Sequence, residues 1–334
     1  MKIGKITDIK GITVGHYTNK EKGTGCTVLL CENGATGGVD VRGTAPGTRE
    51  TDLLKSGQLV EKIHGISLSG GSAFGLDTAG GVMRYLVEKN VGYNIGTNVI
   101  PIVPSAILFD LNLLSNDFSP SITEGYTAAK NASIEFDEGS VGAATGATVS
   151  KMLGWDRCLK GGIGSYCITL DNGIQIGAIA AVNAAGDIVD PKTGTYVSKP
   201  YDRKNKTFDT YMNSLLNSSQ SSNNEDQNIR ENTTLGIVAT NLCLDKSQTN
   251  KLAERGQDGF AMTIQPCHMP GDGDVVFSIS TWESSQNIDR STLTSIYALA
   301  PMVMSEAIIR GTRIASSLGG VPSCNEIQLS KDQK

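Results

Sequence analysis

The chain has 334 residues, a formal net charge of −5 at pH 7 and 39 glycines, while aromatic residues make up only 5%. This length allows one large domain or two small ones, and the glycine content predicts many tight turns and close backbone approaches in an α/β or α+β fold. Because the net charge is acidic and the lysines and arginines form no cluster, neither a nucleic-acid-binding surface nor an anionic-membrane surface is expected.

The N-terminus, the apolar segments and the cysteines indicate a cytoplasmic protein without metal or cofactor. The N-terminus lacks the apolar core of a signal peptide. The apolar tract 296–314 contains Glu306, Arg310 and Arg313, which are too many charges for a membrane span. The seven cysteines show no CxxC spacing, which predicts reduced and largely buried thiols, and three histidines far apart in sequence give little support to metal binding.

Hydrophobic patterns in the first two hundred residues predict a mixture of strands and helices. Short apolar runs bounded by turn residues predict strands at 26–31, 65–69, 161–170 and 174–182. Helical periodicity predicts helices at 51–64, at about 76–89 and at about 123–133. Asp171-Asn172-Gly173 separates the last two strands, and Asn-Gly is a strong signal for a hairpin turn.

The composition changes at about residue 201. Asn, Ser, Gln and Asp dominate the segment 201–231, which can bury little apolar area and is predicted to be a mobile polar surface loop. Such a loop is ordinarily a variable connection; alternatively, it is the tail of a first subunit, released by a cut at its end. Beyond it, the pattern predicts a strand at 235–240, a helix at 245–255, a strand at 274–281, and a helical segment at 289–318 that is interrupted before Pro301.

A hydroxyl residue stands where the polar segment meets the next strand, in Asn232-Thr233-Thr234-Leu235-Gly236. This is where a self-cleaving N-terminal nucleophile would lie. If the Asn232–Thr233 bond breaks, Thr233 gains a free α-amine that can act as the base for its own hydroxyl. The same residues also form a glycosylation sequon and could be an ordinary turn into the strand.

Polar residues elsewhere could complete such a site. Asp272 and Asp274 are close enough in sequence for one carboxylate to raise the pKa of the other or for both to orient a nucleophile, although a surface turn or a weak calcium site is the alternative. Asn183, at the end of a predicted strand, could stabilise an oxyanion, and Lys160 could place a cation near the nucleophile. An Asx turn and an exposed turn lysine are the simpler explanations of these two residues.

Other motifs are predicted to be structural. The glycine-rich segments 69–75 and 139–147 match no phosphate-binding motif, so we expect them to allow close packing of the backbone. No serine lies in a Gly-x-Ser-x-Gly elbow. His268 is close to Asp272 in sequence and is expected to lie on a surface turn.

Several stretches together resemble one family, the self-processing aminopeptidases of the L-aminopeptidase/D-esterase type, which includes β-peptidyl aminopeptidases and nylon-oligomer hydrolases. The resemblance covers nearly the whole chain. The stretches that carry it are 12–16, 39–43, 64–77 (HGISLSGGSAFGLD), 104–111, 139–147, 160–165, 232–241 (NTTLGIVATN) and Asp272-Gly273-Asp274. It implies an α/β fold, the αββα four-layer sandwich, made by a single catalytic domain (1–334) that cuts itself into chains 1–232 and 233–334.

The resemblance also implies roles for individual residues. The nucleophile after the cut at Asn232 would be Thr233, and the other site residues would be Asp272 and Asp274 for orientation, Asn183 for the oxyanion and Lys160 near the nucleophile. The aminopeptidase/esterase members use serine at the cut and a serine–glutamate pair in place of the two aspartates, so the chain is more similar to the threonine, nylon-hydrolase-like branch. Some members place a tyrosine in the site where this chain has Phe109.

The leading hypothesis is a self-processing hydrolase of amide bonds, either an aminopeptidase or an endo-type amidase, that acts on a small peptide or amide. An acyltransferase acting on amino acids through the same acyl-threonine intermediate is the alternative. A non-enzymatic binding or assembly protein that never cuts itself is a third. Family members are commonly homo-oligomers, often tetramers of the cleaved pair, and the same is expected here.

Overall fold

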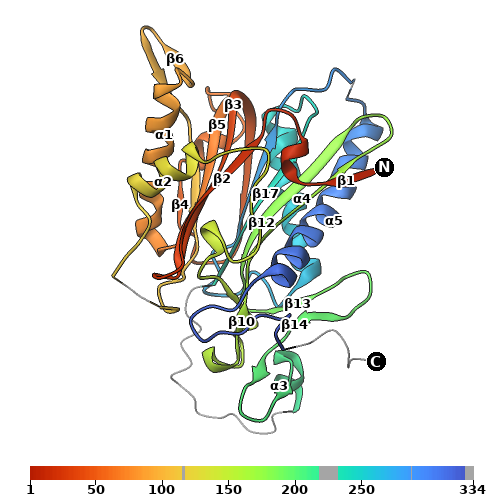
Figure 1. Ribbon diagram of the computed structural model, residues 1–334. Helices are drawn as coiled ribbons and strands as arrows, with labels where there is room; N and C mark the ends of the chain where they lie inside the picture. Colours follow the sequence, from red (N-terminus) through yellow and green to blue (C-terminus); the bar gives the residue numbers. More distant parts are fainter. Residues whose placement is uncertain (115–116, 218–231, 287, 328–334) are drawn as a thin grey trace.

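The computed structural model describes residues 1–114, 117–217, 232–286 and 288–327 of the chain. Two β-layers form its centre, and helices cover their outer faces (Figure 1). On one side lie α1 (Thr78–Glu88) and α2 (Ile122–Lys130), and on the other lie α4 (Lys246–Thr263) and α5 (Arg290–Ile314). This is the αββα arrangement that the resemblance predicts.

One continuous run of hydrogen-bonded strands builds both β-layers, because the long strand β3 (Thr24–Val41) belongs to both. Its first half pairs with β2 (Thr13–Asn19) and β5 (Lys62–Ser69), and its second half pairs with β19 (Val275–Ser280). The strand order is β1-β11-β12-β17-β19-β3-β5-β8-β4. The remaining strands of this run are β1 (Lys2–Gly4), β4 (Thr48–Arg49), β8 (Ser105–Ile107), β11 (Ile163–Thr169), β12 (Gln175–Asn183) and β17 (Thr233–Thr240).

Shorter elements lie around this centre. The small strands are β6 (Tyr93–Ile95), β7 (Asn98–Ile100), β9 (Thr148–Val149), β10 (Leu159–Lys160), β13 (Asp187–Val189), β14 (Tyr196–Ser198), β15 (Tyr201–Asp202), β16 (Thr207–Phe208) and β18 (Ile264–Gln265). The short helix α3 covers Tyr211–Asn217, and 3-10 turns cover Ile6–Asp8, Asp52–Leu54, Ser72–Asp77, Gly142–Ala144 and Trp155–Arg157.

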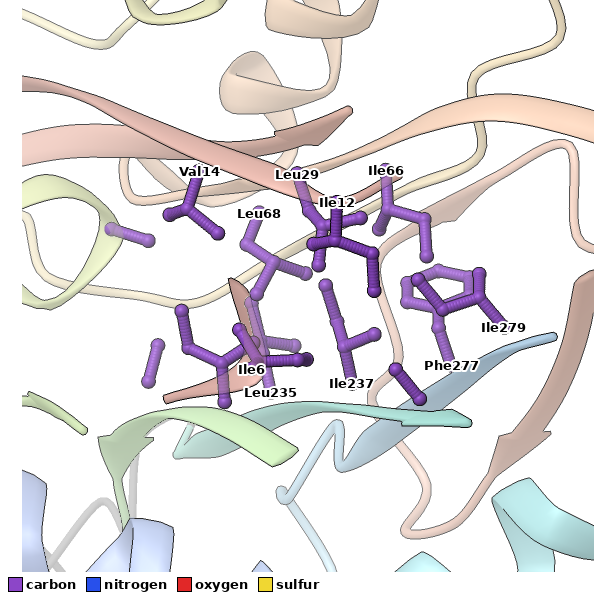
Figure 2. Close-up of a cluster of buried hydrophobic side chains, with 14 of the residues drawn as sticks. Ile6, Ile12, Val14, Leu29, Ile66, Leu68, Leu235, Ile237, Phe277 and Ile279 are labelled. Atoms are coloured by element: carbon purple, nitrogen blue, oxygen red, sulfur yellow. The ribbon is translucent and has the colours of Figure 1, made fainter. Parts of the chain in front are cut away.

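Alternating side chains of the central strands fill the spaces between the layers. Leu235 and Ile237 of β17 point between the two β-layers, where they pack with Phe277 of β19 and with Leu68 of β5 (Figure 2). Val238, on the other face of β17, packs under α4 and α5. Because both faces of β17 are covered, a polar side chain at the start of this strand is also held inside the protein.

The helix predicted at 51–64 is wrong. A 3-10 turn at Asp52–Leu54 is followed by an irregular segment, and β5 begins at Lys62. Gly57 adopts a φ of 86° and Leu59 is 82% exposed, so the chain turns at the glycine and presents no continuous apolar face.

The hairpin between β11 and β12 is confirmed, with antiparallel pairing and a φ of 83° at Gly173 in the turn. The predicted interruption before Pro301 is wrong, because α5 continues through this residue. Proline has no N–H to donate to the carbonyl of Tyr297, and Arg255 Nε of α4 donates to that carbonyl instead, at 3.0 Å. The neighbouring helix thus satisfies the group that the proline leaves free.

Two further segments bear on the predictions. In the polar segment 201–231, the structure forms β15, β16 and α3, while 218–231 lie outside the described residues. Helix α5 is long and apolar enough to cross a membrane by length and composition, but half of its most apolar window is buried. It packs on β11, β12 and α4 as one of the helices that cover the β-layers.

Candidate active site

Thr233 is the first residue of β17 and lies in the middle of the sheet, between β12 and β19. In the antiparallel pairing with β12 it is opposite Asn183. The preceding residue, Asn232, forms a bridge with Asp272, just before β19. The structure therefore brings together Thr233, Asn183 and the acidic segment, and it buries all of them.

The peptide bond between Asn232 and Thr233 is held by the neighbouring backbone. Asn232 N–H donates to the carbonyl oxygen of Gly271 at 3.2 Å, and Gly273 N–H donates to the carbonyl oxygen of Asn232 at 2.9 Å. Gly273 also lies against the hydroxyl of Thr233. A Cβ atom at this glycine would be 2.9 Å from Thr233 Oγ1 and 2.4 Å from the carbonyl oxygen of Ala45, so a larger residue would displace one of them.

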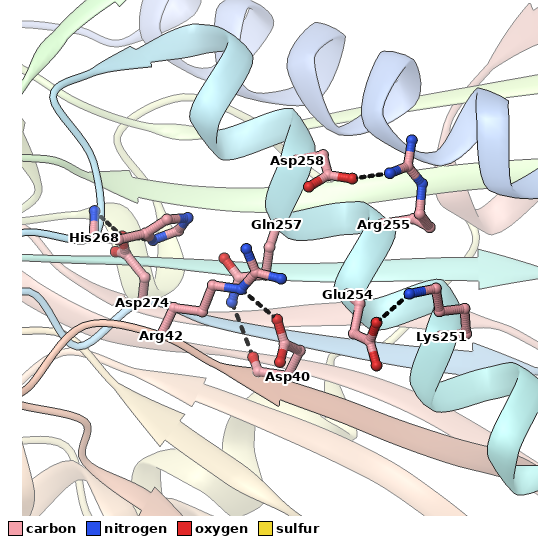
Figure 3. A network of polar contacts seen from close by, with 9 residues as sticks. All are labelled: Asp40, Arg42, Lys251, Glu254, Arg255, Gln257, Asp258, His268 and Asp274. Atoms are coloured by element: carbon pink, nitrogen blue, oxygen red, sulfur yellow. Dashed lines mark hydrogen bonds and ion pairs between the residues drawn. The ribbon is translucent and has the colours of Figure 1, made fainter.

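Asp274 links the start of β17 to a histidine. Its Oδ1 accepts a hydrogen bond from Thr234 N–H at 2.8 Å. Its Oδ2 accepts one from His268 Nδ1 at 2.9 Å, and Figure 3 shows these two side chains together. Burial lowers the pKa of His268, but the hydrogen bond to Asp274 and the adjacent Cys267 thiol outweigh burial and raise it to about 10. The expectation that His268 lies on a surface turn is wrong, because its side chain is only 18% exposed and is paired with Asp274.

Asp272 occupies the turn before β19 and is also buried. Its Oδ2 accepts from Met269 N–H at 2.7 Å, whereas Oδ1 has no hydrogen-bond partner in the part of the chain that the structure describes. Burial, and then the negative charge of Asp274, raise the pKa of Asp272 to about 7. The two aspartates therefore have different environments, and Asp272 can exchange a proton near neutral pH.

Hydrogen bonds fix both ends of the Asn183 side chain. Nδ2 donates to the carbonyl oxygen of Phe109 at 2.9 Å, while Oδ1 accepts from Thr148 N–H and from Lys151 Nζ, both at 3.0 Å. Lys151 Nζ also donates to the carbonyl oxygen of Asn183, at 3.0 Å. A side-chain amide nitrogen carries two N–H groups, so Asn183 keeps one N–H for a further acceptor.

Lys151 is a residue of this site that the sequence reasoning missed. Burial lowers its pKa to about 8, although the surrounding carboxylates, Asp272 and Asp274 among them, partly counteract that effect. Its sequence neighbours form no motif that singles it out. Only the folded structure reveals its contact with Asn183.

Lys160, the lysine predicted from the resemblance, holds the backbone beside this site. It is completely buried, and its Nζ donates to the carbonyl oxygens of Thr145 at 2.9 Å and Ala147 at 2.6 Å. Burial lowers its pKa to about 7. Within the described residues, the lysine that is hydrogen-bonded to Asn183 is Lys151, whereas Lys160 holds the backbone that leads into β9.

A pocket of about 150 Å³ opens beside Thr233. It is lined by Ala45, Pro46, Gly47, Ser72, Ala73, Ile107, Phe109 and Thr233, none of which is charged. The glycine-rich segment 69–75 forms part of this wall, and its Gly71, with a φ of 82°, donates to Asp110 Oδ1 at 2.8 Å. This segment therefore shapes the pocket.

The cysteines are free thiols, and five of the seven are buried, as predicted. In the described ranges, no group of three or more His, Cys, Asp or Glu side chains is arranged to hold a metal ion. The chemistry available beside Thr233 thus comes from a hydroxyl, two carboxyl groups, an amide, a lysine and a histidine.

Residues 4–324 match the family described as peptidase family S58. The chain belongs to this family. It is 34% identical to an uncharacterized aminopeptidase of Mycobacterium tuberculosis over 97% of this chain and 98% of that protein. It is 29% identical to a 6-aminohexanoate-oligomer endohydrolase of Kocuria sp. over 92% of this chain and 85% of that protein. The family predicted from the sequence is confirmed, and this S58-family protein is a hydrolase of amide bonds.

Solved structures show the same fold. The L-aminopeptidase D-Ala-esterase/amidase of Ochrobactrum anthropi, described as a variant of the Ntn-hydrolase fold, aligns with a TM-score of 0.70 at 18% identity, over 95% of this chain and 88% of that chain. A β-aminopeptidase of Burkholderia sp. aligns with a TM-score of 0.69 at 18% identity, over 99% of this chain and 94% of that chain. The predicted αββα fold of the N-terminal nucleophile type is therefore confirmed.

Proposed function

We propose that this S58-family protein cuts its own Asn232–Thr233 bond and then hydrolyses small amides with Thr233 as the N-terminal nucleophile. One observation carries the proposal. The carbonyl oxygen of Asn232 accepts a hydrogen bond from Gly273 N–H, and the hydroxyl of Thr233 lies against the same glycine. A nucleophile, an adjacent amide and a donor for the carbonyl oxygen of that amide thus meet at one point.

In the self-cleavage, Thr233 Oγ1 attacks the carbonyl carbon of Asn232, and the hydroxyl proton passes to the amide nitrogen as the C–N bond breaks. This step leaves an ester between Asn232 and the Thr233 side chain and frees the α-amine, after which water hydrolyses the ester. Gly273 N–H can hold the oxyanion that forms during the attack. One donor of this kind lowers a barrier by about 3–4 kcal/mol.

In each later turnover, the free α-amine accepts the proton of the Thr233 hydroxyl. An unperturbed α-amine has a pKa of about 7.7–8.0, which suits a base near neutral pH. The hydroxyl attacks the substrate carbonyl, the leaving amine takes the proton, and water releases the acyl group. Asn183 supplies an N–H to the oxyanion, Lys151 fixes the orientation of that amide, and Asp274 holds the start of β17 in place.

The pocket beside Thr233 supports a substrate with a small, uncharged acyl group. A volume of about 150 Å³ admits a short aliphatic chain, and the uncharged lining offers no partner for an ammonium or carboxylate group. Relatives bear the names aminopeptidase and endohydrolase, and a short acyl chain is compatible with cleavage at the end or inside a small oligomer.

Denaturing gel electrophoresis with N-terminal sequencing tests the proposal. We expect two fragments, the smaller beginning at Thr233, and turnover of a short-chain anilide by the cleaved protein. Thr233→Ala should remain a single chain without turnover, whereas Thr234→Ala, a matched change at the next residue, should keep the nucleophile. A wild-type chain that stays intact, or an active Thr233→Ala variant, would refute the proposal.

A further inference from the structure

His268 contacts the acidic pair but has no part in the reaction described above. It adopts a φ of 56°, a conformation that residues with a side chain rarely take. This conformation directs both its Nδ1, at 2.9 Å, and its backbone N–H, at 3.3 Å, to the same oxygen, Asp274 Oδ2. Its ring stacks on Phe260, with the ring centres 6.3 Å apart. The imidazole is thus held at one carboxylate oxygen (Figure 3).

Other charged groups also face the pair of His268 and Asp274. Asp272 comes from the same turn. Lys151 follows β9 and interacts electrostatically with the carboxylates of Asp272 and Asp274. Arg42, after β3, donates its backbone N–H to the carbonyl oxygen of Asp274, but its guanidinium pairs with Asp40 at 2.7 Å. Cys267, the preceding residue, adjoins the imidazole. None of these groups donates a hydrogen bond to the side chain of Asp274. Among the described residues, that side chain accepts hydrogen bonds only from His268 and from Thr234 N–H.

We propose that His268 is a positioning residue of the active site: as an imidazolium, it fixes the Asp274 carboxylate against Thr234 N–H and keeps the negative charge of the acidic pair on Asp274. The inference rests on the proposed function, because it gives His268 a part in placing the strand that carries Thr233. It also assigns the proton of the pair to Asp272. Among the described residues, Asp272 Oδ1 is buried without a partner, as is His268 Nε2, and each can donate when protonated.

The charge of His268 can be measured without any turnover. The chain has three histidines, so nitrogen NMR of uniformly labelled Thr233→Ala protein gives three pairs of imidazole signals, and His268→Asn identifies one pair. We expect the His268 imidazole to stay protonated well above pH 7. A titration midpoint near 6.5, the value of an unperturbed histidine, would overturn the proposal.

Kinetics separate a positioning role from a merely structural one. His268→Ala removes both the charge and the side-chain donor, and we expect kcat/KM to fall by about ten- to a hundred-fold. The inflection of the kcat/KM profile nearest neutral pH should move up by about one unit, since the acidic pair loses a facing positive charge. His268→Asn keeps an N–H donor without the charge, so it should recover part of the rate but not the wild-type profile.

Two controls complete the test. His16→Asn also replaces a histidine by asparagine, but in β2, on the other β-layer. It should leave the pH profile of kcat/KM unchanged. Combining His268→Ala with Asp274→Asn should cost no more than Asp274→Asn alone, because the histidine acts through that carboxylate. A folded His268→Ala variant with the wild-type profile would refute the proposal. An uncut, inactive wild-type chain would instead refute the proposed function, and the NMR result would still decide the charge of His268.

Discussion

Gly273→Ala tests the geometry at the proposed cut most directly. The added Cβ would lie 2.4 Å from the carbonyl oxygen of Ala45 and 2.9 Å from Thr233 Oγ1. To reach an ordinary contact distance, the gap to the Ala45 oxygen must widen by roughly 1 Å. Such overpacking costs about 1–3 kcal/mol of stability. The same shift pulls Gly273 N–H away from the Asn232 carbonyl oxygen, and losing one oxyanion donor slows a reaction by about a hundred- to a thousand-fold.

The assay is the rate at which the smaller fragment appears on a denaturing gel after synthesis of the chain. Thermal unfolding of the same sample shows whether the variant has folded. Gly80→Ala in α1 is the matched control, because its Cβ would meet nothing closer than 3.4 Å. A folded Gly273→Ala protein that cuts itself at the wild-type rate would show that neither the close fit nor the Gly273 donor is needed.

Three further changes probe the surrounding groups. Lys151→Met leaves the Asn183 amide without its ammonium partner, so steady-state kinetics should show kcat falling at least ten-fold with a smaller change in KM. An unchanged kcat would exclude Lys151 from the site. Phe109→Ala enlarges the pocket but keeps the backbone carbonyl, so kcat/KM should rise for longer acyl chains relative to acetyl, and an unaltered preference would place the acyl group elsewhere. The pKa of Asp272 is raised to about 7, so below about pH 4 its proton is bound in both folded and unfolded chains, and between pH 4 and 7 it is bound mainly in the folded one. As the pH rises from 4 to 7, the free energy of unfolding of uncut Thr233→Ala protein should therefore fall by a few kcal/mol. The fall should be smaller when Asp272→Asn is added, and urea titration measures both.

The parts of the fold that depend on local pattern could be predicted from the sequence. The hairpin around Asn172-Gly173 follows from turn chemistry, and the strand after Thr233 follows from its apolar run and the polar segment before it. The helix at 51–64 failed because periodicity counts apolar residues without showing whether another layer covers them, and Leu59 remains exposed. The break at Pro301 failed because Arg255, distant in sequence, supplies the missing donor.

Some residues of the candidate site could be predicted from the sequence, and others could not. The positions of Thr233, Asn183 and Asp272 follow from strand ends, and strand ends are visible in a single sequence. Lys151 joins the candidate site through a contact with a residue far along the chain, and His268 through an unusual backbone angle, and neither leaves a local signal. The resemblance pointed to a lysine, and the structure shows that the partly buried Lys151 contacts the asparagine, whereas the fully buried Lys160 binds neighbouring backbone.

The order of strands determines how the two fragments can separate and refold after a cut at Thr233. Strands β17 and β19 are neighbours in the middle of the sheet, with β12 beside one and β3 beside the other. The smaller fragment would supply the two inner strands and the larger fragment those on both flanks, so neither could leave without opening the sheet. Once unfolded, the two pieces would have to meet by diffusion before they could refold. Recovery of the cut protein from denaturant should therefore depend on its concentration, whereas the uncut Thr233→Ala chain should recover at a rate independent of it.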